Sequence, residues 1–61
     1  MAVSERAQYL IEEFEWTRPR HGGDVEVAAP ILELSPTYLE RVLARANKEG
    51  AGVRYKSRKR S

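Results

Sequence analysis

The sequence lacks cysteine and holds few of the residues on which most catalytic and metal sites depend. Its 61 residues include one His, one Met and one Trp. Without Cys there is no disulfide and no thiolate ligand for zinc. A single His gives too few ligands for a metal cage and no redundancy for a catalytic triad. We therefore expect no cofactor, no metal and no catalytic residue, and a protein that is not an enzyme.

Long apolar runs are also missing. No stretch reaches the roughly eighteen apolar residues that a membrane-spanning helix needs. The first six residues turn polar and acidic where an exported protein would carry an apolar segment. A chain this short forms one small core, burying only about 60% of the surface that it exposes when unfolded. We expect one cytoplasmic domain with no membrane contact.

Charge is divided unevenly along the chain. Residues 1–40 hold three basic and eight acidic side chains, a net charge of −5. Residues 41–61 hold eight basic side chains and one acidic, a net charge of +7. Such asymmetry favours a partner made of phosphates over a basic segment that is merely solvated.

Apolar spacing predicts three helices. The first runs from about Ser4, a favourable N-cap, to Trp16, and Pro19 ends it by Arg18. The second follows Asp24, a good N-cap, and runs from Val25 to Leu34. It should have a kink or a ragged first turn because an interior proline costs about 3 kcal/mol. The third begins after Ser35-Pro36 and ends near Gly50. Its inward stripe is Leu39, Val42, Leu43 and Ala46.

Residues 17–24 hold two glycines and a proline, which predicts a loop. We expect His21 to be an exposed loop residue with no ligand role. Arg18 and Arg20, in the same segment, are either secondary phosphate contacts or simply charges that keep the loop soluble.

Residues 25–44, VEVAAPILELSPTYLERVLA, resemble the helix-turn-helix of bacterial and phage DNA-binding proteins. The small Ala29 stands where the second helix must cross closely, Leu32 and Leu34 bracket the turn, and Ser35-Pro36 opens the next helix. Glu33 occupies the turn position where glycine is frequent, at a cost of about 1–2 kcal/mol if its backbone is left-handed. The resemblance implies a homeodomain-like or sigma-region-4-like module.

The resemblance implies an all-α fold: a three-helix helix-turn-helix domain over residues 1–50 and a basic C-terminal arm over residues 51–61. It also implies that the third helix enters the major groove of double-stranded DNA. On a helical wheel Thr37, Arg41, Ala44 and Lys48 face outward. Arg45 and Tyr38 flank them on one side, and Glu40 and Asn47 on the other. Ser35 and the N–H groups of the first turn are suited to a phosphate.

The arm carries five basic residues that we expect on phosphates or in the minor groove. They are Arg54, Lys56, Arg58, Lys59 and Arg60. Tyr55 either pins the arm to the core or stacks on a sugar or base. The arm itself is either a short strand or flexible.

Tyr9 and Trp16 lie away from the apolar stripe of the first helix. Exposed aromatic residues favour an interface, either in a homodimer or with a protein partner, unless Trp16 folds over the following loop. The function we expect is a small transcriptional regulator of a bacterial cell or a phage-infected host. The alternatives are an excisionase-like architectural DNA binder, a protein-docking module acting through Tyr9 and Trp16, and an RNA binder acting through the arm.

Overall fold

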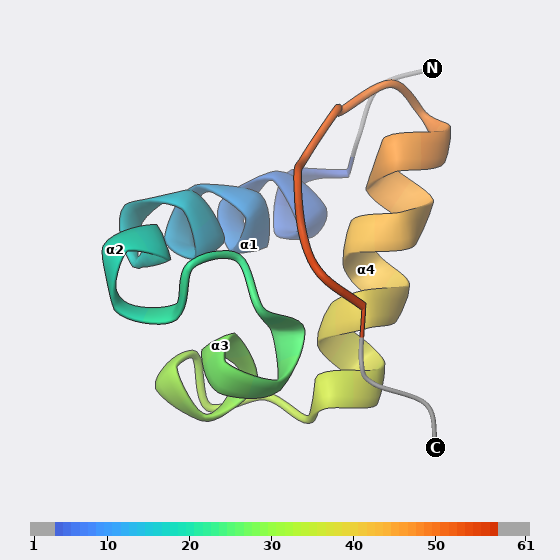
Figure 1. Ribbon diagram of the computed structural model, residues 1–61. Helices are drawn as coiled ribbons and strands as arrows, with labels where there is room; N and C mark the ends of the chain where they lie inside the picture. The colour runs from blue at the N-terminus through green and yellow to red at the C-terminus, as the bar shows by residue number, and fades with distance from the viewer. Residues whose placement is uncertain (1–3, 58–61) are drawn as a thin grey trace.

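A computed structural model describes residues 4–57. In that part of the chain four helices follow one another: α1 (Glu5–Trp16), α2 (Arg18–His21), α3 (Val25–Ile31) and α4 (Pro36–Lys48). Figure 1 shows α1 lying transverse to α4 with its start beside it, α3 near the start of α4, and an extended segment returning along α4 towards α3. The expectation of an all-α fold is confirmed, with no strand among residues 4–57 and a single isolated bridge.

The three predicted N-caps are confirmed. The hydroxyl of Ser4 accepts from the Ala7 N–H at 3.2 Å, and that of Ser35 accepts from the Tyr38 N–H at 3.1 Å. The Asp24 carboxylate accepts from the Glu26 N–H at 2.9 Å. Each cap satisfies a backbone donor that has no partner inside its helix. The helix starts were therefore readable from local sequence.

The expected loop over residues 17–24 is wrong in its centre, where the chain forms the short helix α2. The prediction that His21 is exposed is also wrong, since only 6% of its surface is accessible. Its Nδ1 accepts from the Gly23 N–H at 2.9 Å, so the ring proton lies on Nε2, which faces the Phe14 carbonyl at 3.1 Å. The imidazole also stacks on the Phe14 ring, with centroids 4.6 Å apart. Burial is stable here because both ring nitrogens have partners.

The second predicted helix ends three residues early, at Ile31 instead of Leu34. The helix continues through Pro30, whose missing N–H leaves the Glu26 carbonyl without its helical donor. Both residues are exposed, on a surface where a free carbonyl can bond to water. Glu33 then adopts a left-handed backbone with φ of 60° and closes the helix.

The core is built from a few side chains with no accessible surface. Phe14 comes from α1, Val25 and the two alanines Ala28 and Ala29 from α3, and Leu39 and Leu43 from α4. The predicted inward stripe of α4 is confirmed for Leu39, Leu43 and Ala46, whereas Val42 is only half-buried. The two alanines let the α3 backbone approach α4 closely.

Part of the predicted basic arm belongs to this core. Val53 is buried at 8% accessibility, and Tyr55 packs against the same cluster. The Asn47 side chain on α4 forms hydrogen bonds with both polar groups of the Val53 backbone. Its Nδ2 donates to the Val53 carbonyl at 2.9 Å, and its Oδ1 accepts from the Val53 N–H at 2.7 Å.

The far end of this segment is tied to the start of α3. Lys56 forms an isolated parallel bridge with Asp24. Its N–H donates to the Gly23 carbonyl at 2.8 Å, and its carbonyl accepts from the Val25 N–H at 3.2 Å. Neither a strand nor a flexible arm describes residues 51–56, which form an extended segment held at Val53 and at Lys56.

We expect Asn47→Ala to lower the free energy of unfolding by about 1–3 kcal/mol, because it leaves two backbone groups of Val53 without partners. Urea denaturation followed by circular dichroism measures the change. Asn47→Asp keeps the acceptor but sets a carboxylate oxygen against the Val53 carbonyl, so it should also destabilise the fold. The neighbouring Lys48→Ala is the control, and equal stability of Asn47→Ala and Lys48→Ala would contradict the assignment.

Candidate nucleic-acid interface

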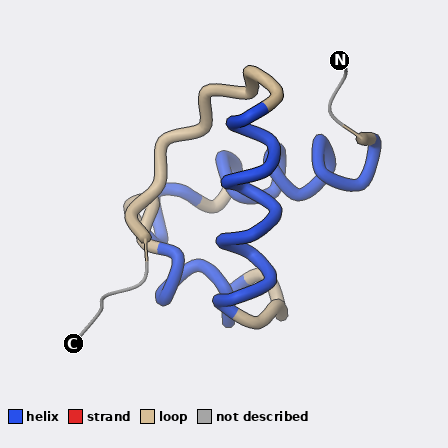
Figure 2. Tube along the Cα trace, turned by 90° about the vertical axis from the view of Figure 1, so that its right-hand side faces the viewer, coloured by secondary structure: helices blue, strands red, loops and turns tan. Residues whose placement is uncertain are grey.

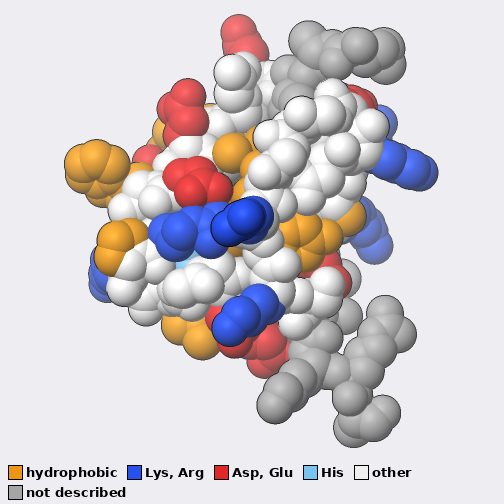
Figure 3. All heavy atoms as spheres, turned by 45° about the horizontal axis from the view of Figure 1, so that its top comes forward, with side chains coloured by type: hydrophobic (Ala, Val, Ile, Leu, Met, Phe, Trp, Pro, Cys, Tyr) orange, Lys and Arg blue, Asp and Glu red, His pale blue; other side chains and the backbone are white. Residues whose placement is uncertain are grey.

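The exposed face of α4 is the candidate interface. Thr37, Arg41, Ala44 and Lys48 are all exposed, as the helical wheel predicted. Among residues 36–48 the helix has three basic side chains and one carboxylate, Glu40. By contrast, α1 has four carboxylates and one arginine. Figure 3 shows Lys and Arg side chains projecting from the edge of the molecule on the side of α4.

The flanking residues lie at the borders of this face. Arg45 and Tyr38 are on the side of α1, where both line the space between α1 and α4. Glu40 is half-buried on the opposite side, towards the segment that Asn47 holds. Ser35 is exposed at the start of the helix, where its hydroxyl serves as the N-cap.

A short connection orients α4 against α3. The Glu33 N–H donates to the Pro30 carbonyl at 3.1 Å, and the Leu34 N–H donates to the Ala29 carbonyl at 2.8 Å. These are the two hydrogen bonds of a Schellman motif, which normally has glycine at the left-handed position. The same pair of bonds ends α4, where Gly50 holds that position. Glu33 therefore carries backbone strain at the point that orients α4.

We expect Glu33→Gly to raise the free energy of unfolding by about 0.5–1 kcal/mol, because relief of the left-handed strain exceeds the added entropy of the unfolded chain. Thermal and urea unfolding measure it. Glu33→Ala removes the same carboxylate but keeps a Cβ atom, so it should give no such gain. A gain of equal size in both variants would show that charge, and not the backbone, is responsible.

The predicted basic residues of the arm fall into two groups. Arg54 and Lys56 are exposed, whereas Val53 is buried and Tyr55 half-buried, so the two kinds of side chain alternate along the extended segment. Arg58, Lys59 and Arg60 lie outside the described residues. The backbone hydrogen bonds of Lys56 therefore hold in place the part of the arm that carries two of the five predicted basic residues, Arg54 and Lys56.

The Arg18 side chain forms hydrogen bonds with other groups of the protein. It donates to both Glu15 carboxylate oxygens, at 2.9 and 2.7 Å, and to the Arg54 carbonyl at 2.7 Å. Its guanidinium also lies 5.2 Å from the centre of the Phe14 ring. The hydrogen bonds lower the pKa of the Glu15 carboxyl and raise the pKa of Arg18. Arg18 thus anchors the C-terminal segment, and a phosphate contact by Arg18 stays a prediction.

Tyr9 and Trp16 are exposed, at 62% and 82% of their surfaces. Both border one shallow hollow beside the α3–α4 connection, which Leu10, Ile31 and Leu32 also line. Trp16 does not fold over the following residues. The two aromatic side chains thus stay outside the core.

One basic residue near α4 was not identified from the sequence. Arg6 belongs to the acidic α1, yet it lines the same space as Arg41 and Arg45 of α4. Helical periodicity gives the face of α1 on which Arg6 lies, but not which helix lies opposite. Only the packing of α1 against α4 places it there.

Comparison with protein-family models, with curated proteins and with solved structures finds no match to this chain. Residues 4–57 contain no group of three His, Cys, Asp or Glu side chains arranged to hold a metal ion. None of the helices in that range has the length and apolar character required to cross a membrane.

Proposed function

We propose that the protein binds double-stranded DNA in a sequence-specific manner, with α3 and α4 acting as a helix-turn-helix and α4 entering the major groove. The observation that carries the proposal is the exposed face of α4, where Thr37, Arg41, Ala44 and Lys48 present polar, cationic and small side chains without a carboxylate. A helix about 10–12 Å across fits a groove about 12 Å wide.

Each residue of this face has a chemical role in the proposal. Arg41 donates two hydrogen bonds to O6 and N7 of a guanine. Thr37 contacts a thymine methyl group or a phosphate, and Ala44 allows the helix to approach the bases. Glu40, at the border, accepts from a cytosine amino group. The Ser35-capped start of α4 faces a phosphate.

The C-terminal segment supplies phosphate contacts in this arrangement. Arg54 and Lys56 are exposed on a backbone that Asn47, Gly23 and Val25 hold in place. A fixed backbone loses less conformational entropy on binding than a free arm does. If about six phosphates are neutralised, the logarithm of the binding constant falls with the logarithm of salt concentration with a slope near −5.

A small transcriptional regulator in the cytoplasm of a bacterial cell or phage-infected host is the role that this chemistry fits. An architectural binder of the excisionase type would use the same residues on phosphates, but would enrich no base pattern from a random pool of duplexes. Selection from such a pool distinguishes the two roles.

We expect Arg41→Ala to weaken binding to the selected duplex by about 1–3 kcal/mol and to lose preference at one base pair. Fluorescence anisotropy and repeated selection measure both effects. Arg41→Lys keeps the charge but not the paired donors, so it should keep affinity for random DNA and still lose the preference. Unchanged affinity and preference in Arg41→Ala would refute the assignment of α4 to the groove.

The exposed aromatic pair supports a second candidate function, contact with a second copy of this chain. The hollow beside Tyr9 and Trp16 is lined by Glu13 and Arg20, which have opposite charges. A patch with both signs can pair with itself across a two-fold axis. Two copies would also double the phosphate contacts on one DNA site.

We expect self-association of the wild-type chain to be weakened at least tenfold in Trp16→Ala, because an exposed Trp at such a contact loses most of its buried area. Sedimentation equilibrium measures the association constant. Gln8→Ala, an exposed change elsewhere on α1, should leave it unaltered. A wild-type chain that stays monomeric at high concentration would rule out this contact.

A further inference from the structure

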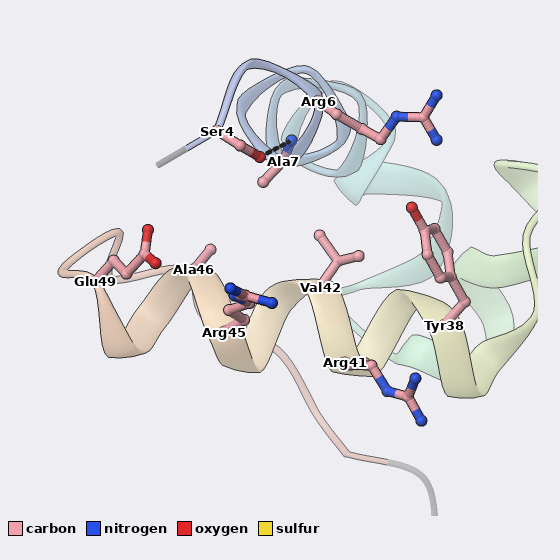
Figure 4. A pocket seen from close by; sticks show the side chains of 9 residues that line it. All are labelled: Ser4, Arg6, Ala7, Tyr38, Arg41, Val42, Arg45, Ala46 and Glu49. Atoms are coloured by element: carbon pink, nitrogen blue, oxygen red, sulfur yellow. Dashed lines mark hydrogen bonds between the residues drawn. The ribbon is translucent and has the colours of Figure 1, made fainter. Parts of the chain in front are cut away.

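An open groove of about 450 Å³ lies between the start of α1 and the side of α4 that faces it. Its floor is apolar, formed by Ala7 from α1 and by Val42 and Ala46 from α4. Figure 4 shows Arg6 on the α1 edge and Tyr38 on the α4 edge at the same end of the groove, with the Tyr38 hydroxyl directed towards α1.

Positive charge gathers around this groove from two different helices. Arg6, Arg41 and Arg45 all line it, and the only carboxylate among its lining residues is Glu49, at the other end. None of the three guanidinium groups forms a hydrogen bond or an ion pair with residues 4–57; in that range the ion pair is Arg18–Glu15. The three cations are therefore available to an external anion.

The groove lies on one side of the exposed face of α4, and the C-terminal segment lies on the other. Figure 2 shows α4 in front, the segment along one side of it and the start of α1 on the opposite side. The hydrogen bonds from Asn47 to Val53 fix the segment on that flank. The face with Thr37 and Arg41 thus stands between two cationic borders, one with Arg6 and Arg45 and one with Arg54 and Lys56.

Two phosphate backbones border the major groove of DNA, one on each side of a helix that lies in it. We propose that Arg6 and Arg45 each hold a phosphate of one DNA strand while Arg54 and Lys56 contact the other strand. Arg6 is then a DNA-contacting residue from a helix that is otherwise acidic, and the Tyr38 hydroxyl is a further donor to the same backbone. This inference rests on the proposed binding of DNA by α4.

The test compares the salt dependence of binding to one duplex for the full chain and its variants, using fluorescence anisotropy. Arg6→Ala should reduce the magnitude of the slope by about 0.9, the value for one lost phosphate contact. Arg6→Lys should restore it, because a point charge suffices for a phosphate. Adding Arg45→Ala to Arg6→Ala should roughly double the loss.

Gln8→Glu is the matched control, since it lowers the net charge by the same unit on the same helix. Residue 8 lies about 200° around the helix from residue 6. Its effect on the slope should be clearly smaller than that of Arg6→Ala. Circular dichroism should give equal thermal unfolding for all these variants, because Arg6 and Gln8 are exposed.

The outcomes separate the two proposals. A slope for Arg6→Ala equal to that of Gln8→Glu, in a protein that still binds DNA and still depends on Arg41 for its preference, overturns the assignment of Arg6 alone. Absence of DNA binding by the wild-type chain overturns both proposals. A reduced slope that Arg6→Lys restores supports the site.

Discussion

The close packing of α3 against α4 is the contact on which the rest of the structure depends. Ala28 and Ala29 have no accessible surface, and the large side chains Leu39 and Leu43 fill the space that they leave. In a chain with so small a core, a larger residue at either alanine would overpack it, at a cost of about 1–3 kcal/mol. The orientation of α4, and with it the direction in which Arg41 projects, depends on how closely α3 packs against α4.

Helix starts were predictable because their signals are local. Ser4, Asp24 and Ser35 each cap a helix within three residues of their own position. The end of α3 was misplaced by three residues because the periodicity of apolar residues continues through Leu34. Such periodicity shows which residues face the core, but not whether they are helical. Leu34 packs against the core although it lies in the connection after α3.

The roles of identical residue types were not predictable in the same way. Arg6 and Arg18 both belong to the acidic half of the chain, yet Arg18 bonds to the Arg54 carbonyl and Arg6 lines a groove with Arg45. His21 was assigned to an exposed loop, although it has partners for both ring nitrogens in the core. These differences arise from contacts between distant segments, which no local pattern encodes.

The bridge between Lys56 and the start of α3 also has a consequence for how the chain acquires its structure. The helices depend mostly on neighbours in sequence, and such local contacts form rapidly. Val53 and Lys56, however, follow the last helix and complete a structure that is mostly formed by earlier residues. During synthesis on the ribosome, the native core is therefore completed only after residues 53–56, which follow all four helices, have been translated.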